Sequence, residues 1–203
     1  MTTLKELLNR PSVKLPEVAL HLNNLNHPER VAQVLALSKK EQVKLWEIAE
    51  KSKPLTLEYV VPRDAQPLQF FPFEGKNSLP AFTHFQKVFY LDQDRNVCGY
   101  NNASIGWLVG PGYYMAQMNP KAPEFEIQVD YTRIPTEHPP AWPEIKSNDV
   151  IPTRFVYGGT KDNLRYVTKD VLIGRAFKMG ESPMPNWFVL CRQTPAPGDG
   201  EKQ

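Results

Sequence analysis

The chain has few cysteines and no long apolar run. Only Cys98 and Cys191 occur among its 203 residues, too few for a disulfide framework, which favours a reducing compartment and two buried thiols. No window approaches the ~20 apolar residues of a membrane-spanning helix. The first residues, MTTLKELLNRPSVKLPE, are polar and lack the apolar stretch of a signal peptide. These absences predict a cytoplasmic protein with no transmembrane segment.

Motifs for common chemistries are also missing. The net charge is only +2, which argues against a dedicated nucleic-acid binder. The glycine spacings of dinucleotide- and phosphate-binding loops do not occur, and neither does the G-x-S-x-G turn of serine hydrolases. No cluster of His, Cys and Asp has metal-ligand spacing, so no metal and no cofactor are predicted. The sequence therefore favours a binding protein over an enzyme and names no catalytic residue.

The chain divides into two unlike parts. Residues 1–53 predict four short helices, with Asn26 as one N-cap and Ser38 and Glu41 at capping-box spacing. Helices this short are unstable alone, so we expect their apolar stripes to pack on the rest of the protein. Residues 54–195 predict a β-barrel domain, and residues 196–203 predict a disordered tail.

The second part has the period-two pattern of β-strands. In FEIQVDYTRI, apolar and aromatic side chains from Phe125 to Tyr131 alternate with polar ones. Further strands are predicted in LTLEYVV, FTHFQKVFYL, VCGYN, RFVYGG, NLRYV, DVLIGRAFKM and NWFVLCRQ, with a turn at Asp92–Asn96. Eight or nine strands at this spacing leave no room for crossover helices. The predicted fold class is therefore α+β, with short N-terminal helices followed by an antiparallel, closed β-barrel. Several strands are apolar on both faces, and the helices are their available cover.

A glycine-rich, aromatic stretch interrupts the strands at residues 102–117. Glycine among strand residues marks a bulge or a tight bend, so Gly106–Gly112 predicts a corner at a barrel rim. Trp107, Tyr113 and Tyr114 flank this bend. Each has a large apolar body and one polar group, so these side chains either line a pocket at the mouth or fill the core.

The segment 134–152 contains five prolines and one tryptophan. A connection of this length without regular structure is uncommon in a compact domain. We expect it to form either a lid over the barrel mouth or a passive surface loop stiffened by proline.

Charged and polar candidates complete the predicted site. Strand parity places Arg133 with Tyr131, and Arg175 on an otherwise apolar face, so both guanidinium groups are predicted to point into the barrel. A buried guanidinium needs an anionic partner, either an acidic ligand or a protein carboxylate. The candidate carboxylates are Asp130, Asp162 and Glu58. His84 lies in a strand, where it either reaches a ligand or forms a structural hydrogen bond. The predicted ligand-binding residues are Trp107, Tyr113, Tyr114, Tyr131, Arg133, Arg175 and His84.

The C-terminal strands resemble a known family. The stretch YVTKDVLIGRAFKMGESPMPNWFVLCR, Tyr166 to Arg192, is similar to the closing strands of the plastid lipid-associated (fibrillin) family. Its members often end in Tyr-Leu-Asp-x-x-Leu-Arg-Ile-x-Arg, a turn, and Leu-Phe-Val-Leu-x-Arg. The matching residues are Tyr166, Ile173, Arg175, Phe188, Val189, Leu190 and Arg192, whereas Val171, Leu172 and Trp187 depart from the pattern. The resemblance covers 27 residues and implies a calycin-like barrel that binds a small apolar molecule.

Three functions remain open from the sequence. The first is the binding or carriage of a small hydrophobic, lipid-like molecule, neutral or acidic, inside the barrel. The second is a small barrel enzyme, such as an isomerase or cyclase, acting on a hydrophobic substrate. The third is a protein-interaction module built from the helices and the proline-rich loop. The sequence does not fix the oligomeric state.

Overall fold

The computed structural model describes residues 2–81, 83–103, 110–151 and 153–194. Its first elements are the helices α1 (Leu4–Leu8), α2 (Leu15–Asn23), α3 (His27–Leu35) and α4 (Lys39–Ile48), which confirm the four predicted helices. Asn26 Oδ1 accepts a hydrogen bond from Glu29 N at 2.9 Å, and Ser38 N donates to Glu41 Oε2 at 2.9 Å. Both predicted caps therefore form, and each satisfies a backbone N–H group at the start of its helix.

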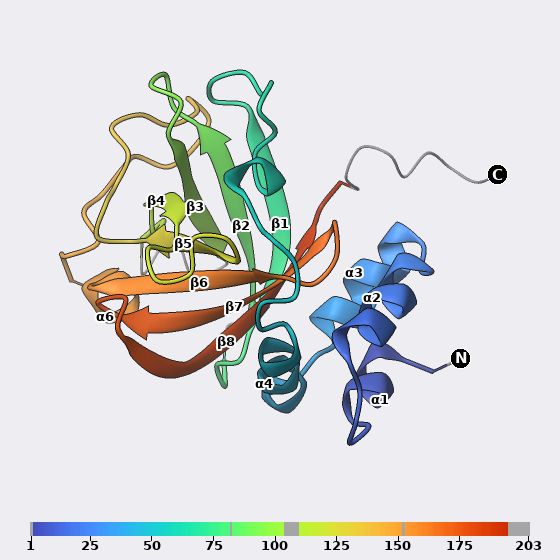
Figure 1. Ribbon diagram of the computed structural model, residues 1–203. Helices are drawn as coiled ribbons and strands as arrows, with labels where there is room; N and C mark the ends of the chain where they lie inside the picture. Colours follow the sequence, from blue (N-terminus) through green and yellow to red (C-terminus); the bar gives the residue numbers. More distant parts are fainter. Residues whose placement is uncertain (1, 82, 104–109, 152, 195–203) are drawn as a thin grey trace.

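The rest of the described chain forms an antiparallel, closed β-barrel (Figure 1). Its strands are β1 (Phe70–Asn77), β2 (His84–Leu91), β3 (Val97–Ala103), β4 (Tyr114–Met118), β5 (Glu126–Asp130), β6 (Thr160–Tyr166), β7 (Val171–Lys178) and β8 (Ser182–Arg192). Each strand pairs with the next along the chain, and β8 returns to pair with β1. The predicted α+β barrel is therefore confirmed. None of the helices in the described ranges is long and apolar enough to cross a membrane.

Two local predictions were wrong, and one strand was missed. LTLEYVV contains the 3₁₀ turn η1 (Leu57–Tyr59) instead of a strand, and RFVYGG contains most of a short helix, α6 (Thr153–Tyr157). Strand β1 was not predicted, because Pro72 and Gly75 interrupt its apolar pattern. The turn predicted at Asp92–Asn96 is present between β2 and β3, where Asn96 N donates to Asp92 Oδ1 at 2.7 Å.

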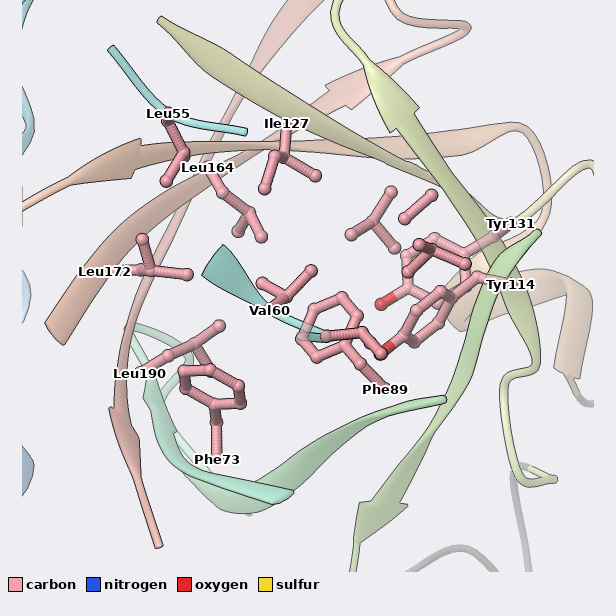
Figure 2. Close-up of a cluster of buried hydrophobic side chains, with 14 of the residues drawn as sticks. Leu55, Val60, Phe73, Phe89, Tyr114, Ile127, Tyr131, Leu164, Leu172 and Leu190 are labelled. Atoms are coloured by element: carbon pink, nitrogen blue, oxygen red, sulfur yellow. The ribbon is translucent and has the colours of Figure 1, made fainter. Parts of the chain in front are cut away.

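Side chains of the segment after α4 close one end of the barrel. Leu55, Val60 and Val61 are at most 3% exposed, and they belong to the same buried cluster as the inward-facing residues of the strands. Figure 2 shows Val60 among side chains that converge from the surrounding wall, including Phe73 and Leu190. The apparent strand LTLEYVV is apolar because it forms this plug.

Aromatic rings fill the barrel interior where glycine leaves the wall bare. A Cβ added to Gly99 would lie 2.1 Å from Val88 O and 2.4 Å from Tyr114 Oη. A Cβ added to Gly174 would lie 2.2 Å from the ring of Phe188. These rings therefore lie directly on glycine backbone, and this part of the interior is packed with side chains.

Helices α3 and α4 pack on the outer face of β7 and β8, and α1 packs against the other three helices (Figure 1). Val171, Ile173 and Val189, all fully buried, form one apolar cluster with helix residues such as Leu45. The helical layer therefore covers the outer apolar face of these two strands. A buried ion pair adds to the interface: Arg30 Nη1 on α3 lies 2.5 Å from Asp170 Oδ2 in the turn between β6 and β7.

The described part of the proline-rich segment, 134–151, packs on a different part of the outer wall. The Trp142 ring lies 4.4 Å from the ring centroid of Tyr100 and 5.4 Å from that of Tyr90. Tyr90 Oη donates to Glu137 O at 2.6 Å, and Asn148 Nδ2 donates to the backbone oxygen of residue 113 at 2.7 Å. The segment thus forms a strap across strands β2–β4, and its role as a lid stays a prediction.

Candidate functional site

Two predicted site residues meet inside the barrel. The rings of Tyr114 and Tyr131 lie 5.5 Å apart, and Figure 2 shows both reaching from the wall toward the interior. Tyr114 Oη donates to Val88 O at 2.8 Å, and Tyr131 Oη donates to Asp162 Oδ2 at 3.1 Å. Burial raises the pKa of both phenols well above their usual value, so they are neutral hydrogen-bonding groups at neutral pH.

Tyr131 belongs to a polar group that we call the Lys87 centre, formed by Lys87, Asn101, Tyr131 and Asp162. Lys87 Nζ donates to Tyr131 Oη at 2.6 Å and to Asp162 Oδ2 at 3.1 Å. Asn101 Nδ2 donates to Tyr131 Oη at 2.7 Å. Lys87 is 1% exposed, and its burial lowers the pKa of the ammonium group, although the charge of Asp162 acts in the opposite direction. The ion pair and its hydrogen bonds therefore join strands β2, β3 and β6 inside the barrel.

Two other predicted residues lie outside this centre. Tyr113 packs under the proline-rich strap, with its ring stacked 5.5 Å from that of Tyr100 and its Oη donating to Pro143 O at 2.6 Å. His84 is exposed at the start of β2, and its Nδ1 lies 3.2 Å from Thr83 Oγ1. The structure thus brings neither residue to the barrel interior, and their predicted ligand contacts remain untested.

The two arginines do not point into the barrel. Arg133 is exposed, and its Nη1 donates to Gln117 Oε1 at 2.9 Å. Arg175 lies on the outer wall, where its guanidinium carbon is 4.6 Å from the Trp187 ring centroid and its Nε donates to Met184 O. Parity groups Arg175 correctly with Ile173, but that shared face is the one covered by helices.

The candidate carboxylates have other partners. Asp130 pairs with Lys161 at 2.7 Å, and Asp162 pairs with Lys87 at 3.1 Å. Glu58 pairs with Arg63 at 3.0 Å. The expectation of Arg133 or Arg175 paired with one of these carboxylates inside the barrel is therefore corrected, because the cation that pairs with Asp162 there is Lys87.

Part of the predicted rim bend lies within the described chain. Gly110 and Gly112 have φ values of +80° and +56°, a backbone conformation that favours glycine. A Cβ on Gly112 would lie 2.4 Å from the ring of Tyr157, which stacks on Tyr131 at 5.0 Å. Trp107, like residues 104–109 as a whole, lies outside the described residues, as does the predicted tail at 196–203.

A groove of about 540 Å³ lies outside the barrel, between the helices and the end of β6. We call it the helix–barrel groove. Its apolar side chains come from the segment leading into α2, from α2 itself, from α4 and from the β6 end. They are Val13, Leu15, Pro16, Ala19, Ile48, Tyr166 and Val167. This volume lies within the range of roughly 300–1,000 Å³ that is typical of small-molecule sites.

Two lysines and one serine supply the polar side chains of the groove. Lys14 and Lys53 line it, and both are exposed. Lys53 Nζ lies 4.9 Å above the Tyr166 ring, and Ser52 Oγ donates to the backbone oxygen of the same tyrosine at 3.0 Å. None of the lining residues is acidic. The groove therefore combines an apolar surface with positive charge.

Sequence reasoning missed Lys87 and the groove for different reasons. In FTHFQKVFYL, Lys87 shares the parity of Phe85 and Phe89, so strand alternation could have placed it on an apolar face. Its partner Asp162 lies 75 residues away, and strand register could not be known. The groove has no local signal, because three distant segments build it.

Among the side chains that the structure describes, no group of three or more His, Cys, Asp or Glu residues could hold a metal ion.

Comparisons with known proteins do not identify the function of the groove or of the Lys87 centre. No protein-family model matches the chain and no curated protein matches it, so the assignment of function rests on the groove and the barrel interior.

Proposed function

We propose that this protein binds a small, apolar, lipid-like molecule with an acidic head group in the helix–barrel groove. The observation that carries the proposal is a groove of about 540 Å³ with an apolar lining, two lysines and no acidic side chain. The resemblance of Tyr166–Arg192 to the fibrillin family also implies an apolar ligand. The proposal keeps the ligand class expected from the sequence but moves its site from the barrel interior to the outer wall.

The packing of the interior supports this change of site. Rings lie directly on Gly99 and Gly174, and the segment around Val60 plugs one end. A long apolar chain in that part of the barrel would have to displace well-packed side chains, which is costly. The groove needs no such rearrangement, because its volume is already open.

Charge complementarity selects the head group. A carboxylate would lie near the ammonium groups of Lys14 and Lys53, while the chain covers apolar residues such as Ile48 and Ala19. Each exposed charge pair contributes up to ~1 kcal/mol. Since about 1.4 kcal/mol corresponds to a tenfold change in Kd, the two lysines together account for roughly tenfold in affinity.

The test measures laurate and palmitate binding to the full chain by titration calorimetry. Ala19 is partly exposed on α2, so Ala19→Trp fills the groove without entering the core. We expect Ala19→Trp to abolish binding, whereas the control Ala32→Trp, at an exposed position on α3, leaves it unchanged. Equal binding by both variants would contradict the proposed site.

A second pair of variants tests the head group. Lys14→Glu combined with Lys53→Glu should weaken laurate binding about tenfold or more. The control combines Lys40→Glu with Lys121→Glu, which changes the net charge equally at exposed positions outside the groove. Dodecanol, which lacks the carboxylate, should bind wild type and both double variants alike. Loss of affinity in the control as well would indicate a net-charge effect and refute the assignment of the head group.

A further inference from the structure

Strands β5 and β6 carry polar side chains on their outer face that are nevertheless buried. Glu126, Gln128 and Asn163 are 6%, 4% and 5% exposed, and they alternate with core residues such as Ile127 and Leu164. Side chains of these types are mostly exposed on a barrel wall. A cavity of about 300 Å³ adjoins them, which we call the β5–β6 pocket. Its lining comes from the segment after α4, the β4–β5 connection, β5, β6 and the β7–β8 hairpin: Glu50, Lys51, Asn119, Lys121, Ala122, Phe125, Glu126, Asn163, Arg165, Phe177, Gly180 and Glu181.

The buried amide of Asn163 has a hydrogen-bond donor to spare. Asn163 Oδ1 accepts a hydrogen bond from Gln128 Nε2 at 3.2 Å, and this bond fixes which end of the amide faces β5. Nδ2 therefore points away from Gln128, and no residue in the described ranges accepts a hydrogen bond from it. A buried donor without an acceptor is unfavourable. An oxygen atom of a ligand in the pocket would satisfy it.

Arg165 supplies a second donor on the same face of β6, two residues further along the strand. Its Nε donates to Glu126 Oε1 at 2.8 Å and its Nη1 donates to Trp46 O at 2.9 Å, whereas Nη2 has no acceptor among the described residues. The other oxygen of Glu126 accepts from Asn119 Nδ2 at 2.6 Å, so that carboxylate is already held. Asn163 Nδ2 and Arg165 Nη2 together suit a second carboxylate, since guanidinium–carboxylate hydrogen bonds are strong.

The rest of the lining offers charges of both signs and two aromatic rings. Phe125 and Phe177 supply the rings, and Phe177 is held from behind by the Trp46 ring at 6.5 Å. A lone anion would leave the acidic side chains of the rim without a partner, whereas a molecule with a carboxylate, an ammonium group and an apolar body complements the whole lining. The charged rim residues are all exposed, and none forms an ion pair within the described chain: Glu50, Lys51, Lys121 and Glu181.

We infer that the β5–β6 pocket binds a free aromatic α-amino acid. The ligand's carboxylate accepts hydrogen bonds from Asn163 Nδ2 and Arg165 Nη2. Its ammonium group faces the rim glutamates, and its ring packs against the two phenylalanines. The volume lies at the lower end of the range typical of small-molecule sites, which suits a ligand of this size. The pocket shares no lining residue with the helix–barrel groove, so this inference does not depend on the proposed function.

The first experiment titrates the full chain with L-phenylalanine and follows two-dimensional amide NMR spectra. We expect saturable shifts that include the side-chain amide signal of Asn163, which is identified by its absence from the Asn163→Asp spectrum. Hydrocinnamate lacks the ammonium group and phenethylamine lacks the carboxylate. Each should bind at least about tenfold more weakly than L-phenylalanine, because one charged group of the site then has no partner.

Variants then test the two ends of the ligand. Asn163→Asp keeps an acceptor for Gln128 Nε2 but replaces the free donor with a negatively charged oxygen, so the affinity for L-phenylalanine should fall about tenfold or more. The control Asn102→Asp makes the same change at an exposed position on β3, outside the pocket, and should bind like wild type. Glu50→Gln combined with Glu181→Gln should weaken L-phenylalanine binding without weakening that of hydrocinnamate.

Three results would overturn the inference. They are the absence of saturable shifts with L-phenylalanine, equal affinity for L-phenylalanine and either analogue, and a folded Asn163→Asp variant that binds like wild type. If Asn163→Asp does not fold, the comparison of the three ligands on the wild type decides alone. Ala19→Trp fills the groove and leaves the β5–β6 pocket open, so it should still bind L-phenylalanine whatever becomes of the proposed function.

Discussion

The buried ion pair between helix α3 and the barrel offers the sharpest test of how the two layers are joined. Arg30 and Asp170 have side chains 4% and 0% exposed, and the pair measures 2.5 Å. The guanidinium also donates to Leu22 O and Leu25 O. Asp170→Asn keeps the size of the side chain but removes its charge, so the Arg30 cation remains in a site from which water is excluded.

Breaking one side of a buried pair costs about 3–5 kcal/mol. For a chain of 203 residues, each kcal/mol lowers Tm by roughly 2–4 °C, so we expect Tm to fall by about 6–20 °C. Urea unfolding followed by tryptophan fluorescence and thermal unfolding followed by circular dichroism both measure the loss.

Glu58→Gln is the matched control, because it breaks the Arg63–Glu58 pair, whose side chains are 86% and 46% exposed. Its cost should stay below ~1 kcal/mol. Replacing both buried partners, Arg30→Met with Asp170→Leu, should recover most of the lost stability. The reasoning is refuted if Asp170→Asn loses no more stability than Glu58→Gln.

Three further predictions concern buried groups of the barrel strands. Burial raises the pKa of Tyr114 and Tyr131, so the unfolded chain loses these protons first, and the free energy of unfolding should fall as pH rises above about 10. Urea titrations should show that Tyr131→Phe has a smaller pH dependence there, and an equal dependence would contradict this. Burial also raises the pKa of Cys98 well above its usual range and that of Cys191 to about 12, so a thiol reagent should label both only on unfolding. Rapid labelling of the native protein would show that a thiol is accessible. Gly99→Ala should lower the free energy of unfolding by about 3 kcal/mol, since its Cβ would lie 2.1 Å from Val88 O. An unchanged urea midpoint would show that the wall can move aside.

Period-two patterns predicted which residues share a face, but not which face is the interior. Strand β7 is buried on both sides, with Ile173 under the helices and Leu172 in the barrel core. Arg175 follows the parity of Ile173 and therefore lies outside. The better signal was Gly174, because a position without a side chain is where a ring such as that of Phe188 can lie against the backbone on the inner face.

Local composition also gave a wrong secondary structure where tertiary contacts determine the conformation. LTLEYVV has the residues of a strand, but Val60 and its neighbours serve as a plug and need no partner strand. The four helices were predictable because caps and periodicity are local signals. The groove was not, because Ala19, Ile48 and Tyr166 meet only after the helices pack on the barrel.

Strand β8 is the shared partner of the earliest parts of the chain. It closes the barrel by pairing with β1 at Phe73–Asn77, and α3 and α4 pack against it. The ribosome adds about 5–20 residues per second, so these helices wait on the order of ten seconds for that surface to emerge. Until then the apolar face that includes Val34 and Leu45 has no barrel wall to cover it. A nascent chain that has not yet reached Ser182 is therefore the species most prone to aggregate or to bind a chaperone. Once β8 has been synthesised, the barrel can close and the helices can pack on it.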